Sequence, residues 1–388
     1  MTMAEESPAL IVGAGIGGLA AAIALRRAGR EVVVLERVPE LNEAGSGLSL
    51  WPNAVKALRK LGLQAFVDEQ GHAADIGAVY TWRGKTLAQT TTSDVERGGG
   101  VPLAVSRAEL LAALRSAVAS LTPGASVVRF GAQVVRFEQD PSGVTVHFAD
   151  GQHARGSMLI GADGLRSVVR SQLFGAEPPR YAGFTAWRAV VPAPRDQPLL
   201  IGEFWGAGQV FGIVPIGHER IYWFATRNAR EGEIDTPAER KREILARFTS
   251  WYPAIPALIQ STPEEAILRN DIYDRPPLAA WSRGRVTLLG DAAHPMTPNL
   301  GQGACQALED AVILGASLSG TTDIPQALRA YQAARLPRAN MIAQRSRQMS
   351  DIVQRSGPLA RWARDTLVRA MPSAVRLKQL KPITGYEV

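Results

Sequence analysis

The pattern of apolar and polar positions changes along the chain, and each pattern predicts a different kind of element. Short apolar runs at Ala9–Val12 and Glu31–Leu35 flank an alanine-rich stretch at Leu19–Ala28. Such runs are typical of buried strands and the stretch between them of a helix, so the chain opens with a β-α-β unit. Two further buried strands are expected at Met158–Ile160 and Val286–Leu289.

Between Phe174 and Pro277 the pattern becomes an alternation of apolar and polar residues with period two. This alternation predicts an antiparallel sheet inserted into the surrounding domain. The expected strands are Tyr181–Val190, Leu200–Trp205, Val210–Pro215 and Ile221–Thr226.

Helical periodicity and turn residues supply the remaining elements. Ser106 and Glu109 have the spacing of a capping box, and Pro337 predicts a break or kink within a long helix. Helices are expected at Pro52–Leu61, from Ser106 onward, and at Gly301–Leu318, Pro325–Ile352 and Leu359–Met371, with turns around Gly84 and Asp140–Gly143.

Composition narrows the class of protein. The chain has 388 residues, enough for two packed domains, and no apolar run approaches the roughly 20 residues of a membrane span. The single cysteine, Cys305, allows no disulfide within the chain, and the N-terminus has no signal-peptide pattern, so we expect a cytoplasmic protein. The five histidines show no metal-ligand spacing, and no metal is expected.

The net charge of +7 has two interpretations. One is a protein that binds nucleic acid or an anionic membrane. The other is an arginine-rich enzyme, and the scattered distribution of the arginines favours it.

A glycine fingerprint follows the first predicted strand and opens the first helix. Gly13 permits a tight turn, Gly15 lets backbone N–H groups approach a pyrophosphate, and Gly18 allows close packing of helix on strand. Glu36, at the end of the second strand, is placed to accept hydrogen bonds from an adenosine ribose, and its charge disfavours a 2′-phosphate. The pattern predicts FAD or NAD rather than NADP, the alternative being a glycine turn without a ligand.

Two other predicted strands each lead to an aspartate. Asp291 follows one strand, and Gly301–Gly303 then opens a long helix. A carboxylate there suits a polyol hydroxyl, and the helix start offers N–H groups to an electron-rich ring edge, as a flavin requires. Asp163 lies in the second segment, Gly161–Gly164. The alternatives are a helix cap for Asp291 and an ordinary turn residue for Asp163.

Together the three motifs resemble those of the single-component (group A) FAD-dependent aromatic hydroxylases, the para-hydroxybenzoate hydroxylase superfamily. The resemblance covers about residues 8 to 388, and Gly45–Ala54 is similar to the family segment beside the flavin. Tyr181–Arg188 is similar to the urate, salicylate and 3-hydroxybenzoate hydroxylase branches. The cation that the urate branch carries near Gln209–Phe211 is absent here, which argues against urate.

The resemblance implies an α/β fold with a Rossmann-like FAD-binding domain, an inserted antiparallel β-sheet substrate domain and C-terminal helices. The FAD-binding domain is expected to comprise residues 1–72, 101–173 and 277–354. Residues 73–100 and 174–276 would form the substrate-binding sheet, and residues 355–388 the C-terminal helical segment.

Residue roles follow from the same resemblance. Glu36 and Arg37 would hold the adenosine end of FAD, Asp291 the ribityl chain, and Asp163 both flavin and nicotinamide. Pro295 would lie near the reactive face of the flavin. Arg107 and Val134 have ordinary alternatives, as a surface arginine and a strand valine. The implied cofactor-binding residues are Gly13, Gly15, Gly17, Gly18, Glu36, Arg37, Ser49, Arg107, Val134, Asp163, Asp291, Gly301, Gln302 and Gly303.

The resemblance also implies a reaction. NADH or NADPH reduces FAD, O2 forms a flavin C4a-hydroperoxide, and one oxygen atom passes to a small aromatic or heteroaromatic substrate. Pro295, Arg188 and Tyr222 are the catalytic candidates, with Arg188 binding an anionic substrate and Tyr222 assisting proton transfer. The alternative for Arg188 is an ion pair, and for the aromatic residues the core of the sheet. The substrate-binding candidates are Trp187, Phe204, Phe211 and Phe224.

Other functions stay open at this point. An epoxidase or another natural-product tailoring oxygenase would share all the motifs. A halogenase or a flavin reductase-type enzyme would share only the glycine fingerprint. A non-enzymatic NAD-binding module would leave Asp291 and Gln302 without a purpose.

Overall fold

The computed structural model describes residues 7–40, 46–70, 78–89, 100–121, 126–194 and 199–388. Gly45 and part of the predicted substrate-sheet segment at residues 73–100 lie outside these ranges. Among the described residues, no helix combines the length and apolar character needed to cross a membrane.

A six-stranded sheet has the order β17-β18-β11-β1-β2-β7. β1 pairs in parallel with β2 and β11, and β11 pairs in parallel with β18, so segments far apart in the chain form its centre. All four residues of β1 are buried, which explains its unbroken apolar run. The strands are β1 (Ala9–Val12), β2 (Val32–Leu35), β7 (Val128–Arg129), β11 (Met158–Gly161), β17 (Ser282–Arg283) and β18 (Val286–Leu288).

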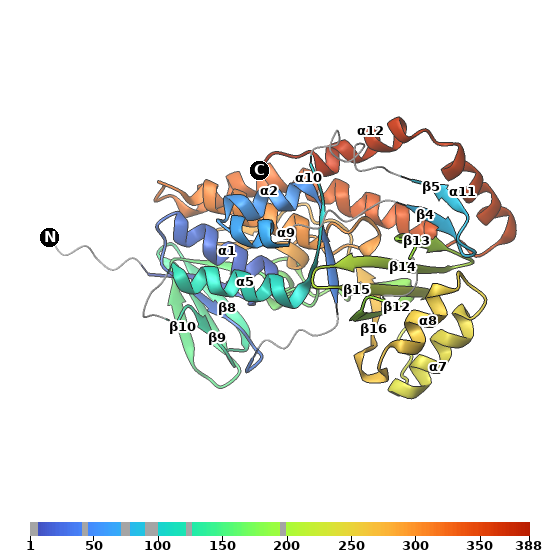
Figure 1. The fold of residues 1–388 in the computed structure, drawn as a ribbon. Coiled ribbons are helices and arrows are strands. Elements are labelled where there is room, and N and C mark those ends of the chain that lie inside the picture. The colour runs from blue at the N-terminus through green and yellow to red at the C-terminus, as the bar shows by residue number, and fades with distance from the viewer. Residues whose placement is uncertain (1–6, 41–45, 71–77, 90–99, 122–125, 195–198) are drawn as a thin grey trace.

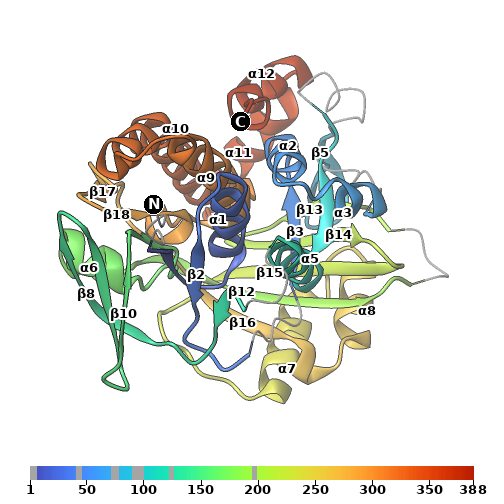
Figure 2. The ribbon, with the colours of Figure 1, turned by 90° about the vertical axis from the view of Figure 1, so that its left-hand side faces the viewer.

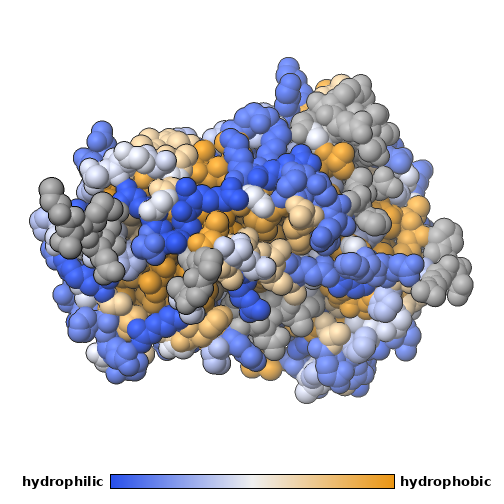
Figure 3. All heavy atoms as spheres, turned by 60° about the vertical axis from the view of Figure 1, so that its left-hand side comes forward, coloured by the Kyte–Doolittle hydropathy of each residue, from blue (hydrophilic) through white to orange (hydrophobic). Residues whose placement is uncertain are grey.

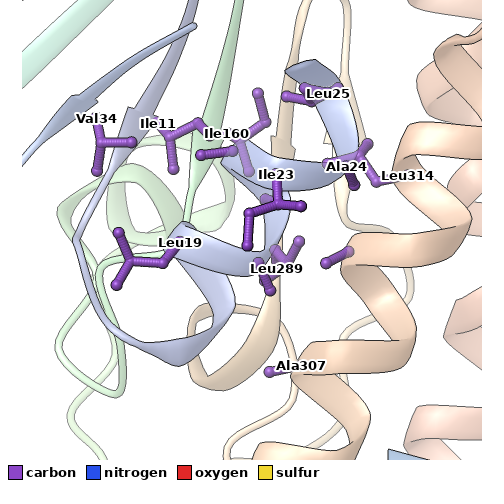
Figure 4. Packing of buried hydrophobic residues seen from close by; sticks show 14 of the residues in the cluster. Ile11, Leu19, Ile23, Ala24, Leu25, Val34, Ile160, Leu289, Ala307 and Leu314 are labelled. Atoms are coloured by element: carbon purple, nitrogen blue, oxygen red, sulfur yellow. The ribbon is translucent and has the colours of Figure 1, made fainter. Parts of the chain in front are cut away.

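Helices α1 (Ile16–Arg27) and α9 (Gly303–Leu318) pack closely beside this sheet (Figure 2). A Cβ on Gly17 would lie 2.7 Å from Leu289 Cδ2 and 3.4 Å from Ala307 Cβ. One on Gly315 would lie 2.8 Å from Ala24 Cβ. Contacts therefore advance in the same direction along both helices, so α1 and α9 run parallel with their N-termini at the same end (Figure 4).

The second sheet has the order β16-β12-β15-β14-β13-β4-β5, and helices α7 and α8 lie on one side of it (Figure 1). Its pairs are antiparallel except for β13 with β4, so the prediction of a wholly antiparallel sheet is corrected at that edge. The elements are β4 (Val79–Thr81), β5 (Thr86–Ala88), β12 (Arg180–Pro192), β13 (Gly202–Trp205), β14 (Gln209–Ile216), β15 (Arg220–Asn228), β16 (Leu268–Asp274), α7 (Pro237–Phe248) and α8 (Ala254–Ser261).

Smaller elements connect and cover the two sheets. β3 (Gly47–Leu50) pairs with β6 (Leu103–Ser106), and a three-stranded sheet has the order β10-β9-β8. These last strands are β8 (Val134–Asp140), β9 (Gly143–Phe148) and β10 (His153–Gly156). The other helices are α2 (Pro52–Lys60), α3 (Gln64–Glu69), α5 (Arg107–Ser120), α6 (Val168–Phe174), α10 (Ile324–Val353), α11 (Pro358–Ala370) and α12 (Ser373–Thr384).

Two local expectations are wrong. Pro337 lies inside α10, which continues as one helix of 30 residues packed against α9, so the predicted break is absent, while the alternative of a kink stays a prediction. Ser106 makes no side-chain cap, and Glu109 instead accepts a hydrogen bond from Arg220. A capping box is formed instead by Thr236 with Glu239, at the start of α7.

Candidate functional site

The turn from β1 into α1 depends on two glycines for steric reasons. Gly13 has a φ of 103°, and a Cβ there would lie 2.5 Å from the Ala162 carbonyl oxygen. A Cβ on Gly18 would lie 1.9 Å from the Gly13 carbonyl oxygen. Gly15 differs, because nothing lies within 4 Å of its Cβ position and no side chain caps α1. The first turn of α1 thus presents backbone N–H groups to open space, which suits a pyrophosphate.

Glu36 braces this turn. Its carboxylate accepts hydrogen bonds from the backbone N–H of Ala14 at 2.7 Å and of Val38 at 3.1 Å. The Glu36 carbonyl also accepts from Ala132, which places the buried Val134 close by. Arg37 is exposed. The residues predicted for the adenosine end therefore lie together, while the predicted bond from Glu36 to a ribose stays a prediction.

Asp163 caps helix α6. It accepts hydrogen bonds from the Ser167 hydroxyl at 2.5 Å and the Val168 N–H at 2.7 Å, while burial raises its pKa against the effect of these bonds. Arg170 of the same helix donates to the carbonyls of Ala292 and Ala293, at 3.1 Å each. The segment around Asp163 thus supports the segment that follows Asp291. The predicted contacts of Asp163 with flavin and nicotinamide stay predictions.

The third motif gathers side chains from three elements. The Asp291 side chain has a large solvent-accessible surface. Protein atoms nevertheless surround its carboxyl group closely, and this burial raises its pKa, as expected for a group that faces an enclosed space. A Cβ on Gly303 would lie 3.9 Å from Asp291 Oδ1. A Cβ on Gly301 would lie 3.1 Å from Trp51 Nε1 and 3.9 Å from Ser49 Cβ. The charges of His294 and, to a smaller extent, Arg107 oppose this rise in the pKa of Asp291 without cancelling it.

Buried polar atoms around this point lack partners. Among the described residues, Trp51 Nε1, Gln302 Nε2 and Asn299 Oδ1 have no hydrogen-bond partner. Such atoms are costly unless something satisfies them, so they indicate a ligand with a polar edge. The arrangement fits FAD: open N–H groups at Gly15 for the pyrophosphate, Asp291 for hydroxyls, and unpaired polar atoms for the ring edge.

The sequence reasoning missed a buried charge network beneath the site. Asp310 accepts from the Gly290 N–H at 3.0 Å, His294 Nε2 at 2.6 Å and Arg335 Nε at 2.7 Å. Burial opposes ionisation, but His294 and Arg335 hold the pKa of Asp310 at about 2. Arg335 also binds Glu309. Adjacent acids inside an otherwise apolar helix were the available signal, because such charges are buried only when paired.

The two faces of the second sheet have different surroundings. Trp187, Phe204 and Phe211 are 0% exposed and pack in one cluster with α7 and α8, where the Phe211 and Phe248 rings lie 5.4 Å apart. Their burial favours the alternative that these three residues form the core of the sheet, and their role as substrate-binding residues stays a prediction. Period-two alternation separates the two faces of a strand but does not say which face meets the neighbouring domain.

The opposite face carries Arg188, Tyr222 and Phe224, all partly exposed. Tyr222 packs on β3, because a Cβ on Gly47 would lie 2.5 Å from Tyr222 Cγ. Arg188 lies close enough to Tyr222 to act on its hydroxyl electrostatically and to oppose the rise in its pKa that burial causes. The candidate substrate residues of the sheet thus lie beside the strand that holds Ser49, while Pro295 is buried after β18.

Comparisons with known proteins agree with this geometry. A family model described as "FAD binding domain" matches residues 6–346. The aurachin C monooxygenase/isomerase of Stigmatella aurantiaca is 44% identical over 369 residues, covering 94% of each chain. An FAD-dependent urate hydroxylase of Klebsiella pneumoniae is 37% identical over 351 residues, covering 89% of this chain and 90% of the relative. The crystal structure of Klebsiella pneumoniae HpxO with FAD and uric acid superposes with a TM-score of 0.87 at 34% identity, covering 97% and 96%.

Proposed function

This chain belongs to the FAD-binding family of group A monooxygenases, and from that premise we propose that it transfers one oxygen atom of O2 to a small heteroaromatic or other aromatic substrate. One observation supports this proposal most strongly. The polar groups around Asp291 and Trp51, which suit a cofactor, lie beside Tyr222 and Arg188 of the second sheet. The predicted family, fold class, enzyme class and FAD cofactor are confirmed by the matches.

Bound FAD supplies the redox chemistry, accepting electrons from NADH or NADPH and activating O2. The chain's own groups hold it in place. The N–H groups at the start of α1 bind the pyrophosphate, and the carboxylate of Asp291 accepts hydrogen bonds from ribityl hydroxyls. Trp51 Nε1 would donate to the polar edge of the ring system, and the bond would satisfy an atom that is otherwise buried without a partner.

Substrate orientation is assigned to the second sheet. Burial raises the pKa of Tyr222, so its hydroxyl keeps its proton at neutral pH, although Arg188 opposes this shift. A protonated hydroxyl donates to a substrate oxygen, and the guanidinium stabilises negative charge on that oxygen. Pro295 contributes shape beside the cofactor.

The relatives support a heteroaromatic substrate. Two relatives are urate and aurachin C enzymes by name, and urate is a purine. The strand of Gln209–Phe211 carries no cation, and its Phe211 lies in the core, so urate itself is not the substrate we favour.

The test is a turnover assay with FAD-loaded protein, NADH or NADPH, isotopically labelled O2 and a panel of phenols, quinolones, purines and olefins. We expect one labelled oxygen atom in the product of at least one compound. Incorporation only into olefinic compounds would instead indicate the epoxidase alternative. Nicotinamide oxidation without labelled product from any compound would contradict the proposal.

A further inference from the structure

One row of side chains crosses four strands on the face of the second sheet that carries Tyr222. Glu203 on β13 pairs with Gly212 on β14, Gly212 pairs with Phe224 on β15, and Phe224 pairs with Arg188 on β12. Directly paired residues of antiparallel strands project to the same side of the sheet. The row therefore places a carboxyl group at one end and a guanidinium at the other.

The middle of the row is a flat apolar surface. Gly212 has no side chain, and a Cβ there would lie 2.1 Å from Phe224 Cε1. The phenyl ring thus covers the glycine and occupies the space between the two charged residues. Phe224 packs against the cluster of Trp205, Val210 and Val353 but remains partly exposed, so the part of its ring that this cluster leaves uncovered can stack with another ring.

The carboxyl group of Glu203 uses only part of its capacity to accept hydrogen bonds. It accepts a hydrogen bond from Trp205 Nε1 at 2.8 Å. No basic group in the described part of the chain acts on this carboxyl, and burial raises its pKa. The side chain nevertheless keeps some accessible surface. An enclosed acid with one partner and free accepting capacity is suited to a ligand N–H donor.

The other end of the row is already organised to donate hydrogen bonds. Arg188 donates to the Asn270 side-chain oxygen at 3.3 Å and acts electrostatically on the nearby Tyr222 hydroxyl. These contacts fix the guanidinium on the side of the row that lies beside β3. Its remaining N–H groups, together with the Tyr222 hydroxyl, suit an anionic or carbonyl oxygen.

We propose that this row binds a planar heteroaromatic ring that stacks on Phe224, donates a ring N–H to Glu203, and presents an oxygen on its opposite edge to Arg188 and Tyr222. Three strand spacings separate the Cα atoms of Glu203 and Arg188 by roughly 14 Å. After the reach of both side chains, that span accommodates one small ring system with a hydrogen bond at each end. The inference rests on the proposed function, for which it names the substrate class and orientation.

The test measures equilibrium binding to FAD-loaded protein without nicotinamide, so that it does not depend on turnover. The probes are 4-quinolone, which has a ring N–H opposite its oxygen, and N-methyl-4-quinolone, which lacks the donor. We expect wild-type protein to bind the N–H compound about tenfold more tightly, the effect of one hydrogen bond to a carboxyl group. Glu203→Met should abolish this preference, while Glu203→Gln, which keeps an accepting oxygen, should retain most of it.

Two controls separate recognition from folding. Glu265→Gln changes an exposed carboxylate next to α8, and it should leave both affinities unchanged. Arg188→Met should weaken both probes to a similar extent, because both carry the oxygen. Equal binding of the two probes to wild type, equal loss of both in Glu203→Met, or no binding of either would overturn the inference. Oxygenation of other rings in the turnover assay would then leave the proposed function standing.

Discussion

At the scale of single residues, the glycines of the first turn differ in what they are needed for. Gly18→Ala places a Cβ against the Gly13 carbonyl, so we expect a loss of at least about 3 kcal/mol of stability, or no folded protein. Gly15→Ala meets no atom of the protein, so we expect normal thermal unfolding but weaker FAD binding. Thermal unfolding with and without added FAD measures both effects. If Gly18→Ala and Gly15→Ala were equally stable and bound FAD equally weakly, the two glycines would not differ in this way.

Cys305 provides a second prediction for a single residue. Burial raises its pKa to about 12 from the ordinary 9.0, so the thiol stays protonated and should resist alkylation in the folded protein. The folded state holds its proton more tightly than the unfolded state. The stability that this residue contributes is therefore complete below pH 9.0 and is lost as the pH rises toward about 12. Comparing the pH dependence of Tm with that of Cys305→Ala tests this, and identical profiles would count against it.

The sequence predicts single residues well where the requirement is local. Gly13, Gly15 and Gly18 follow from the geometry of a strand turning into a helix, and the structure shows close approaches at Gly13 and Gly18 and open space at Gly15. It predicts them poorly where both faces of a strand are apolar. Trp187 and Phe224 are equally aromatic, and only the packing of α7 and α8 decides which of them lies in the core.

At the scale of elements, a buried ion network joins α9 to α10. Arg335, 0% exposed, binds Asp310 and Glu309, so Arg335→Met removes one cationic partner from each of two buried carboxyl groups. We expect a loss of about 3–5 kcal/mol in the free energy of unfolding. Arg329→Met, on an exposed position of the same helix, should change it by no more than about 0.5 kcal/mol. Chemical denaturation measures both, and similar values would show that the network contributes little.

Elements were predictable where periodicity was strong. The four strands expected between Tyr181 and Thr226 correspond to β12, β13, β14 and β15. Helices α7 and α8 were not predicted, because they are short amphipathic segments that directly follow the period-two strands. The continuity of α10 through Pro337 was also unpredictable, since it depends on tertiary packing against α9.

At the scale of the whole molecule, the two sheets meet where Tyr222 packs on Gly47. Gly47→Ala would push the tyrosine away from β3. We expect unchanged FAD content, a KM for the substrate about tenfold higher, and less product per nicotinamide consumed, because one lost orienting hydrogen bond costs about 1.5 kcal/mol. Gly357→Ala, at an open position with an ordinary backbone angle, is the matched control. A normal KM in Gly47→Ala would show that the contact between Tyr222 and Gly47 does not help to orient the substrate.

The order of the motifs along the chain was predictable, but the contacts between the segments that carry them were not. The sequence of three motifs predicts one cofactor site assembled from distant segments, and the structure brings those segments together. The division into residue ranges of separate domains stays a prediction. Figure 3 shows a largely hydrophilic face with hydrophobic areas between. Composition alone did not predict where on the surface these hydrophobic areas lie.

The parallel pairing of β1, β11 and β18 has a consequence for synthesis of the protein on the ribosome. Ile160 on β11 pairs with Ile11 and with Thr287, so the central sheet gains its next strand only when a segment nearly 130 residues further along has been made. The apolar face of α1 that α9 covers stays open until then as well. High contact order of this kind slows folding and prolongs exposure of apolar surface. The nascent chain should therefore depend on chaperones until α9 emerges.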